Sequence, residues 1–426
     1  MYVKEYLDEL VERGREIIFL DNVSREYEVT RYVYENRDKV IVFKLKGSDI
    51  TCYTNIFSDR RDLYSILKVE NDIEAYERII YALNNPIKPD LADFNEYFIE
   101  TNYTLDHMPF IKYFREDGGY YLTSSIIIAC IGDICNASYH RMMYRNNREA
   151  VVRIVPRHLY RIYRGYSEKG EDTPVAVVLG VDPLFGVFAA STPPYGVFEL
   201  ESFISLEQRE KIVKTPKYRI PVPSSSSIVL EGVISSREYS DEGPFVDVLG
   251  LSDTIRKQPV FKLDRIYVNK HTGPYYHAIV PSLWEHILLM GFPREALIYD
   301  SVRKVSPNIK AIRLTFGSGG WLHAVVSIKQ GRPGEARNVG LAVFNAHPSV
   351  KHVVIVDDDI NIDDPLMIEW AIATRVKGGE DLIVLKDLYG STLDPRSDEG
   401  LGDKVLVDAT KPFNEPWSKY RRASIP

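Results

Sequence analysis

Several features that mark whole classes of protein are scarce in this chain. The sequence has only three cysteines, Cys52, Cys130 and Cys135, and none of them forms a CxxC pair. A zinc site or a disulfide framework is therefore not expected, and free thiols favour a reducing compartment. The net charge is −7 and basic residues form no long run, which disfavours a nucleic-acid partner bound through its phosphates.

Long apolar stretches are missing as well. The first residues, MYVKEYLDELVERG, are charged and lack the apolar core of a signal peptide. No uninterrupted apolar run reaches the length of a membrane-spanning helix. We therefore expect a cytoplasmic protein without a membrane span, and the charge balance still allows a small anionic ligand.

The chain is long enough, at 426 residues, for two or three domains. Helical and strand-like segments alternate over 1–105, where Ser24 is the expected N-cap of a helix over 25–37. Residues 106–290 are mostly strand-like, with β-branched runs between Gly, Pro and Ser turns, and such spacing suggests a barrel. Alternation returns over 291–426. The predicted fold class is α/β (α+β), in three domains with these boundaries.

Helices are also expected within and after the central strands. RHLYRIYRGYSEKG and FELESFISLEQREKIV are helical in pattern, and Glu199 lies in the first turn of the second. Residues from about Pro395 onward are expected to form a polar tail that contains Lys404.

The stretch from Asn136 to His158 concentrates polar chemistry between apolar runs. It contains five arginines, and we expect two strands joined by a loop over 141–147. Such a hairpin would place Asn136, Arg141, Arg153 and His158 near its ends.

Asn136, His158 and Glu199 together offer an amide oxygen, an imidazole and a carboxylate. This nitrogen and oxygen set suits a divalent ion such as Mn²⁺ or Mg²⁺ better than zinc or copper. The alternative is structural: Asn136 caps a turn, His158 lies on the surface and Glu199 complements a helix dipole.

Glu242 and Asp247 enclose a Gly-Pro turn in the segment EGPFVD. If Arg141 reaches both, one carboxylate stays ionised while the other, poorly solvated, has a raised pKa and can donate a proton. The alternative is an acidic surface turn. By contrast, Asp357, Asp358 and Asp359 after a buried strand are assigned to structure, and Asp363 and Asp364 before Pro365 to the first turn of a helix.

A resemblance extends these patterns. The segments from Asn136 to Arg141, VVRIVPRHL, LGVDP, STPPYGVFE, IVLEG, EGPFVD, WLHAVVSIKQ, VVIVDDDIN with EWAIATR, and GLGDKVLVDAT occur in one order from Asn136 to Thr410. Together they resemble the UbiD family of decarboxylases, which use prenylated FMN. The resemblance implies an N-terminal α/β domain, a central split β-barrel that binds the flavin, and a C-terminal α/β domain that mediates oligomerisation.

The resemblance also implies roles for individual residues. Asn136, His158 and Glu199 would hold a divalent metal, usually manganese, against the cofactor phosphate, with a potassium ion nearby. Arg141, Glu242 and Asp247 would be catalytic: Arg141 orients the substrate carboxylate, Glu242 holds Arg141, and Asp247 donates the proton. Cofactor contacts would come from Tyr139, His140, Arg141, Arg153, Ile154, Val155, His158, Leu159, Thr192, Pro193 and Lys404.

The activity implied is reversible, non-oxidative decarboxylation of an α,β-unsaturated acid through an adduct with prenylated FMN. The length resembles compact archaeal members, which suggests trans-anhydromevalonate 5-phosphate as the substrate and isopentenyl phosphate as the product, in the archaeal mevalonate pathway. A (polyprenyl-)hydroxybenzoate or another aromatic acid is the alternative substrate. An FMN-dependent oxidoreductase and a non-catalytic assembly protein are alternatives of other classes. Expected partners are a flavin prenyltransferase as cofactor source and further copies of the chain, in a dimer or hexamer.

Overall fold

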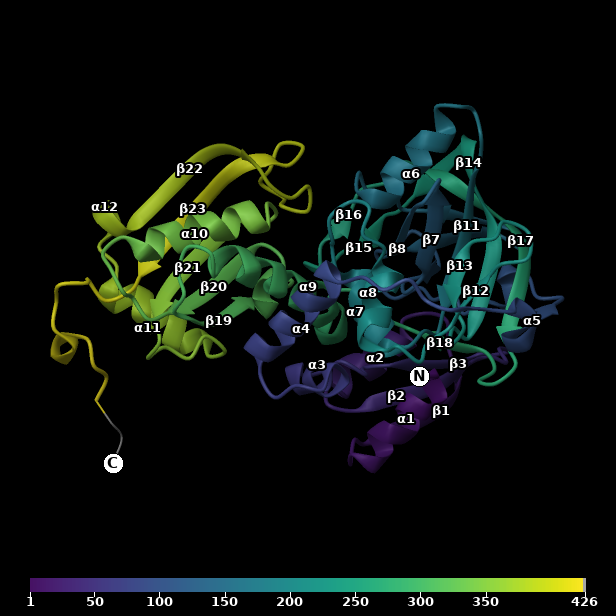
Figure 1. Cartoon of the computed structure of the whole chain (residues 1–426), viewed down its shortest axis with the longest axis horizontal. Coiled ribbons are helices and arrows are strands. Elements are labelled where there is room, and N and C mark those ends of the chain that lie inside the picture. Colours follow the sequence, from purple (N-terminus) through teal and green to yellow (C-terminus); the bar gives the residue numbers. More distant parts are fainter. Residues whose placement is uncertain (424–426) are drawn as a thin grey trace. The chain divides into compact units, whose positions relative to one another are not determined.

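The computed structural model describes residues 1–423, and the chain divides into two compact units (Figure 1). The first unit comprises Met1–Val69 and Tyr81–Leu289, and the second comprises the rest. Each unit mixes helices and sheets, which confirms the predicted fold class. The division into three domains remains a prediction. Within the part of the chain described, no helix combines the length and apolar character that a membrane crossing requires.

Short helices connect the strands of the first unit. They are α1 (Val3–Glu12), α2 (Glu28–Glu35), α3 (Arg60–Leu67), α5 (Phe94–Tyr97), the 3-10 helix η1 (Leu105–His107), α6 (His158–Ser167), α7 (Pro183–Ala190) and α8 (Glu199–Leu206). Two further helices, α4 (Asp72–Asn84) and α9 (Trp284–Val302), contribute residues to both units.

Helices α6 and α8 confirm the two helices expected among the central strands, and Glu199 is the first residue of α8. The second helix is shorter than expected, because it ends at Leu206 and Ile212–Lys214 form a strand. The predicted cap of α2 is wrong. This helix begins at Glu28 after Tyr27, because the Ser24 hydroxyl instead accepts the Glu26 backbone N–H over 3.1 Å in a local turn.

Four sheets make up the rest of the first unit. A four-stranded sheet has the order β1 (Ile17–Val23), β2 (Val40–Leu45), β3 (Thr51–Thr54) and β18 (Tyr275–His277). A nine-stranded sheet has the order β6 (Tyr121–Leu122), β9 (Met142–Asn146), β10 (Glu149–Val152), β17 (Arg256–Asn269), β14 (Ile228–Glu242), β11 (Thr173–Leu179), β7 (Ile126–Ile131) and β8 (Ile134–Tyr139), with β5 (Phe98–Thr101) paired to β17. Two small sheets contain β13 (Pro221–Pro223), β12 (Ile212–Lys214) and β4 (Leu91–Ala92), and β15 (Phe245–Val246) with β16 (Ser252–Asp253).

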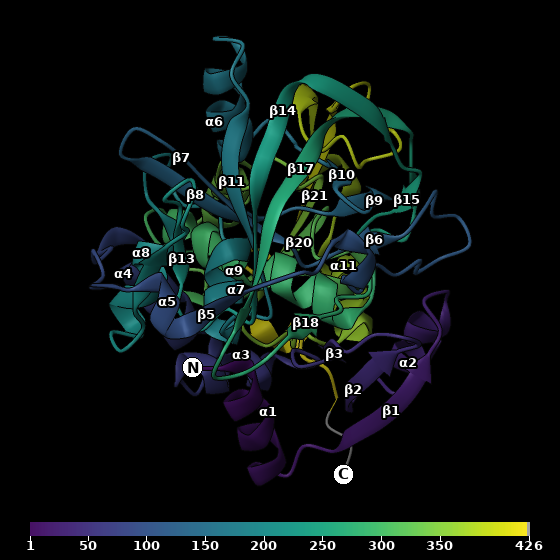
Figure 2. The same cartoon turned by 90° about the vertical axis from the view of Figure 1, so that its right-hand side faces the viewer.

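The nine-stranded sheet is organised around β14 and β17, the long antiparallel strands that lie side by side in Figure 2. The sheet follows an open path from β6 to β8, and no pairing of these two strands closes it in residues 1–423. The mostly β character of the central region is confirmed, whereas the split barrel is not.

The predicted loop over 141–147 is wrong for most of its length. Met142–Asn146 form β9, which pairs with β10 in an antiparallel hairpin. The strand forms because Met142 is buried and Tyr144 packs against the core, so alternate side chains face inward. Asn136 and Arg153 therefore lie at opposite parts of the sheet order and not on one hairpin.

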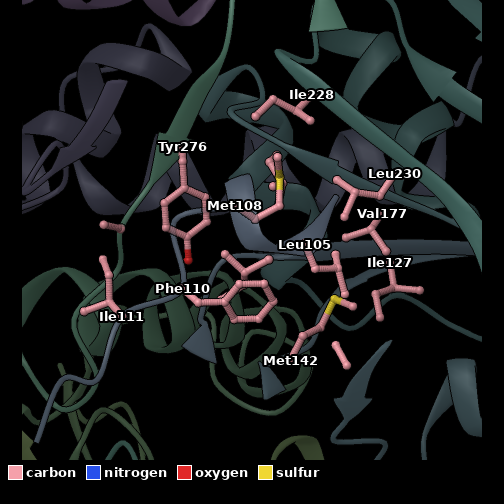
Figure 3. Packing of buried hydrophobic residues seen from close by; sticks show 14 of the residues in the cluster. Leu105, Met108, Phe110, Ile111, Ile127, Met142, Val177, Ile228, Leu230 and Tyr276 are labelled. Carbon is pink, nitrogen blue, oxygen red and sulfur yellow. The ribbon is translucent and has the colours of Figure 1, made fainter. Parts of the chain in front are cut away.

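A continuous hydrophobic core fills the first unit (Figure 3). Ile127 of β7, Val177 of β11 and Leu230 of β14 come from neighbouring strands, while Met108 and Phe110 come from the segment between β5 and β6. Consecutive residues of β7 are fully buried, as expected of a strand covered on both faces. This packing gives the site a rigid scaffold.

The structure corrects the expectation that all three cysteines are free thiols. Cys130 and Cys135 are joined by a disulfide, and only Cys52 is free and buried. The two half-cystines are direct cross-strand partners in the β7–β8 hairpin, which brings their Cα atoms to 4.1 Å. A search for CxxC spacing alone misses such a pair, so cysteine usage no longer argues for a reducing compartment.

The second unit is built on one five-stranded sheet. Its order is β19 (Ile309–Leu314), β20 (His323–Ile328), β21 (His352–Asp357), β23 (Leu401–Ala409) and β22 (Leu382–Tyr389). The remaining helices are η2 (Phe316–Ser318), α10 (Glu335–Ala346), α11 (Pro365–Arg375), α12 (Gly378–Asp381) and η3 (Trp417–Lys419).

The prediction of a polar tail after Pro395 is wrong for β23. This strand lies between β21 and β22, and Leu406 and Ala409 within it are fully buried. Leu406 and Ala409 are three residues apart and therefore lie on opposite faces of the strand, so both faces of β23 contribute to the packing. The expected cap of the helix that follows β21 is confirmed: Asp364 precedes α11 and accepts the Leu366 backbone N–H over 2.9 Å.

Candidate active site

Asn136 and Glu199 lie 63 residues apart in sequence and meet in the fold. Asn136 is on the end strand β8, and its Nδ2 donates to Oε1 of Glu199 over 2.8 Å. The Ala137 backbone N–H donates to Oε2 over 2.8 Å, so both carboxylate oxygens are bound. Ser138 Oγ in turn donates to Asn136 Oδ1 over 3.0 Å.

Glu199 is a buried carboxylate that no basic side chain accompanies among residues 1–423. Burial raises its pKa to about 8, although the hydrogen bonds from Ala137 and Asn136 act against that rise. With this pKa the Glu199 carboxyl is mostly protonated at neutral pH, and a cation bound beside it would favour its ionised form. The oxygen donors of Asn136 and Glu199 therefore fit a hard divalent cation.

His158 begins helix α6, and its ring packs edge-on against Tyr195 with 5.5 Å between centroids. Burial lowers its pKa, and the positive charges of Arg161 and Arg157 lower it further. The neutral imidazole that results is the form that binds metals. In residues 1–423, His158 forms no hydrogen bond with Asn136 or Glu199, and no three His, Cys, Asp or Glu side chains gather as a metal-binding group. The three-residue metal set remains a prediction.

The predicted contact between Arg141 and Glu242 is present. Arg141 Nε donates to Glu242 Oε1 over 2.7 Å, and Nη2 donates to Oε2 over 2.9 Å. The Glu242 side chain is fully buried and that of Arg141 is 14% exposed. The guanidinium also lies 4.3 Å from the ring centroid of Phe245. Two parallel hydrogen bonds fix the orientation of the guanidinium.

A second carboxylate that the sequence did not reveal also binds Arg141. Asp253 Oδ2 accepts from Arg141 Nη2 over 3.3 Å, and Asp253 Oδ1 accepts from Arg256 Nη1. Burial acts to raise the pKa of Asp253, but the hydrogen bond from Arg256 and the charges of Arg141 and Arg256 outweigh it and lower the pKa. No sequence pattern signals this contact, because Asp253 and Arg141 are 112 residues apart.

Asp247 lies outside these ion pairs. Its Oδ1 accepts the Leu249 backbone N–H over 2.8 Å, and burial raises its pKa, as does the charge of Asp253. The hydrogen bonds from backbone N–H groups and the charge of Arg141 only partly oppose that rise. The condition that Arg141 reaches both Glu242 and Asp247 is not met, because its second hydrogen-bonded partner is Asp253.

The turn between Glu242 and Asp247 is held from behind by another buried aspartate. Asp117 accepts the Val246 backbone N–H over 3.0 Å, and the Gly118 N–H donates to the Pro244 carbonyl over 2.7 Å. A Cβ on Gly118 would lie 2.3 Å from the carbonyl oxygen of Gly243, so glycine is required there. These contacts fix the direction in which the turn presents Asp247.

The two segments expected to contact the cofactor are joined by hydrogen bonds. The Arg153 N–H donates to the Arg141 carbonyl over 3.1 Å, and the Ile154 N–H donates to Gln258 Oε1 over 2.8 Å. His140 bridges the Arg153 carbonyl and Ser138 Oγ, each over 2.9 Å, and burial lowers its pKa to about 4. Of the remaining predicted residues in the first unit, Leu159 and Pro193 are buried, and Tyr139, Val155 and Thr192 are partly exposed.

Lys404 lies in the second unit, on strand β23. Its Nζ donates to the carbonyl oxygens of Val350, over 3.0 Å, and Pro348. Burial lowers its pKa. Its predicted contact with the cofactor stays a prediction.

Sequence comparison shows which proteins this chain is similar to. Residues 87–283 match the Rift-related domain of 3-octaprenyl-4-hydroxybenzoate carboxy-lyase (UbiD), and residues 287–409 match its C-terminal domain. Anhydromevalonate phosphate decarboxylase of Aeropyrum pernix is 40% identical, over 95% of this chain and 92% of that protein.

Solved structures agree as well. The UbiD-class enzyme HmfF from Pelotomaculum thermopropionicum, in complex with FMN, has a TM-score of 0.93 and 32% identity, covering 100% of this chain and 97% of that one. An evolved dimeric form of HmfF, in complex with prFMN, has a TM-score of 0.89 and 30% identity, with the same coverage. This chain therefore belongs to the UbiD family of carboxy-lyases.

Proposed function

We propose that this enzyme decarboxylates trans-anhydromevalonate 5-phosphate to isopentenyl phosphate. The observation that carries the chemistry is the division among the acids around Arg141: Glu242 pairs with it, while Asp247 remains outside the pair. The substrate comes from the printed name of the relative from Aeropyrum pernix, which is similar to this chain over nearly its full length.

Arg141 is the residue that orients the substrate carboxylate. Its Nε and Nη2 are directed to Glu242, so the guanidinium plane is fixed before substrate arrives. An arginine whose orientation is preset loses less conformational entropy when it binds a carboxylate.

Asp247 is the proton donor. Its pKa is raised by burial, so the carboxyl retains its proton at a pH where an exposed aspartate is ionised. After carbon dioxide leaves, this carboxyl delivers a proton to the carbon that carried it. Glu242 holds Arg141 and does not exchange protons with substrate.

The cofactor in this proposal is prenylated FMN, which supplies the electron sink for decarboxylation when bound. The chain residues that would hold it are the joined segments 139–141 and 153–155. Asn136 and Glu199, with His158, would hold Mn²⁺ or Mg²⁺ against its phosphate, and K⁺ would bind nearby. The support for the metal is the buried Glu199 carboxylate that lacks a cationic partner.

A flavin prenyltransferase is the proposed source of the cofactor, and the cytoplasm is the proposed location. We also propose that the chain assembles as a homo-oligomer. The support for self-association is that an evolved form of the similar enzyme HmfF is dimeric.

The test is coexpression with a flavin prenyltransferase, followed by the intact mass of the bound cofactor and carbon dioxide release from trans-anhydromevalonate 5-phosphate. A prenylated-FMN mass together with release supports the proposal. Bound cofactor with release only from 4-hydroxybenzoate would favour the aromatic alternative, which the family description names. Absence of any flavin would contradict the cofactor assignment.

A further inference from the structure

The cluster around Arg141 contains more positive charge than a carboxylate substrate requires. Three guanidinium groups, those of Arg141, Arg153 and Arg256, lie with two ion-paired carboxylates, Glu242 and Asp253. The third acid, Asp247, forms no ion pair and is the proton donor of the proposed function, so the ion-paired groups leave one positive charge in excess. In the proposed function Arg141 faces the substrate carboxylate. The excess charge is available to a second anionic group.

The fold brings these residues together at one end of the long strands. Glu242 ends β14 and is directly opposite Arg256, the first residue of β17. Arg153 follows β10, and its backbone is bonded to that of Arg141. Burial and the charges of Arg256 and Arg141 lower the pKa of Arg153, which agrees with this proximity.

The carboxylates of the cluster are deeper than its cations. The side chains of Glu242 and Asp253 are 0% and 9% exposed, whereas those of Arg141 and Arg256 are 14% and 33% exposed. The accessible part of the cluster is therefore cationic, and the anions beneath it hold the guanidinium groups in place.

Asp253 couples the two arginines. One of its oxygens binds Arg141 Nη2 over 3.3 Å and the other binds Arg256 Nη1. A single carboxylate that binds both guanidinium groups keeps them close enough for two ends of a short-chain substrate. An arginine anchored in this way presents its remaining N–H groups in a fixed fork, which suits phosphate oxygens.

We propose that Arg256, anchored by Asp253, binds the phosphate group of the substrate and selects phosphorylated acids over their unphosphorylated counterparts. This inference rests on the proposed function. Arg256 is a specificity residue in this proposal, and Asp253 is a positioning residue.

The test compares kcat/KM for two substrates that differ only in the phosphate: trans-anhydromevalonate 5-phosphate and the same acid with a free hydroxyl. The holoenzyme is assayed as wild type, Arg256→Gln and Lys257→Gln. Lys257 is the adjacent residue, exposed and paired with Asp241 over 3.0 Å, and it serves as the matched control.

We expect Arg256→Gln to reduce the preference for the phosphorylated acid by about 10- to 100-fold, the usual loss when one charged hydrogen-bond partner is removed. Lys257→Gln should leave the preference unchanged. Arg256→Lys, which keeps the positive charge and so protects folding, should reduce the preference by a smaller factor.

An unchanged preference in Arg256→Gln and Arg256→Lys would overturn the inference alone, whether activity with the two acids is retained or falls equally. Equal losses would mean that Arg256 acts only through Asp253 and Arg141. A wild-type holoenzyme that releases carbon dioxide from neither acid would overturn the proposed function together with the inference.

Discussion

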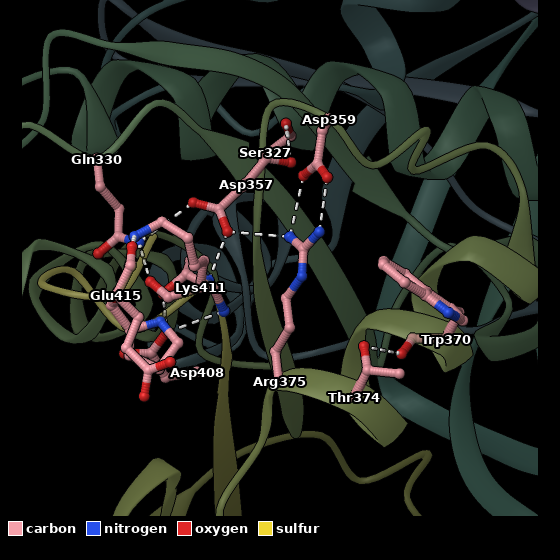
Figure 4. A network of polar contacts seen from close by, with 12 residues as sticks. Ser327, Gln330, Asp357, Asp359, Trp370, Thr374, Arg375, Asp408, Lys411 and Glu415 are labelled. Atoms are coloured by element: carbon pink, nitrogen blue, oxygen red, sulfur yellow. Dashed lines mark hydrogen bonds and ion pairs between the residues drawn. The ribbon is translucent and has the colours of Figure 1, made fainter. Parts of the chain in front are cut away.

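Two arginines, each held by two carboxylates, distinguish the two units of this protein. In the first unit Arg141 binds Glu242 and Asp253 and keeps 14% of its side chain exposed. In the second unit Arg375 binds Asp357, over 3.0 Å, and Asp359, and its side chain is fully buried (Figure 4). In each case one carboxylate accepts from two guanidinium nitrogens and the other accepts from one, but the surroundings differ.

In the Arg375 cluster the cation is buried and one of its anions is accessible, since the Asp359 side chain is 39% exposed. Asp357 also accepts from Gln330 Nε2 over 3.2 Å and from the Lys411 backbone N–H, which ties β21 to the segment after β23 (Figure 4). Around Arg141 the cations remain accessible, and a third acid, Asp247, lies nearby without an ion pair of its own. An ion cluster with a buried guanidinium holds elements together, whereas accessible guanidinium groups beside an acid of raised pKa can act on a substrate.

The largest effect on activity is expected when Asp247, the acid beside the Arg141 cluster, is removed. Asp247→Asn should lower kcat by about 10²- to 10⁴-fold, the range typical of a general acid. The amide oxygen can still accept the Leu249 N–H, so thermal unfolding should change little. Steady-state carbon dioxide release measures the loss, with the exposed Asp241→Asn as control. Full activity in Asp247→Asn would exclude Asp247 as the proton donor.

In the Arg375 cluster the main effect of a substitution should be on the free energy of unfolding. Arg375→Met leaves Asp357 and Asp359 without their guanidinium, so the free energy of unfolding should fall by about 3–5 kcal/mol. Urea unfolding measures it. Arg337→Met in the same unit, where the pair with Asp381 is 3.9 Å long and partly exposed, should cost at most about 1 kcal/mol. Equal losses in both variants would contradict a structural role specific to Arg375.

A smaller effect is expected at the backbone turn that carries Asp247. Gly118→Ala places a Cβ against the Gly243 carbonyl, so the turn that carries Asp247 must move, at about 1–3 kcal/mol of unfolding free energy. Gly317→Ala, where a Cβ meets nothing within 4 Å, is the control. Differential scanning calorimetry of both variants measures the difference in stability. If Gly118→Ala is as stable as Gly317→Ala, close contact with the Gly243 carbonyl does not require glycine at position 118.

The smallest expected effect concerns pH. Because burial and Asp253 raise the pKa of Asp247, activity that needs its protonated form should fall as pH rises through that raised pKa. Asp253→Asn removes one negative charge, so the pKa of Asp247 should decrease and the fall should begin at a lower pH. The positive charge of Arg141, which opposes the rise in the pKa of Asp247, remains in this variant. A pH profile of kcat/KM checks the direction, and a shift to higher pH would contradict the assignment.

Much of the candidate site followed from sequence because its residues lie in contiguous segments that resemble a known family. The pairs Asn136 with Glu199 and Arg141 with Glu242 were both anticipated, and both are hydrogen-bonded in the structure. Asp253 was missed, since no local pattern shows which of several acids after a Gly-Pro turn will face an arginine 112 residues away.

The sequence by itself determined the mixed α/β class, the strand-rich centre and the helices that begin at His158 and Glu199, because apolar periodicity and local turn residues specify these features. Only the tertiary structure decided the disulfide between Cys130 and Cys135, the inclusion of β23 in a sheet, and the choice of Asp253 over Asp247 as a hydrogen-bonded partner of Arg141. Each of these depends on strand register and side-chain direction, which arise from packing between residues distant in sequence.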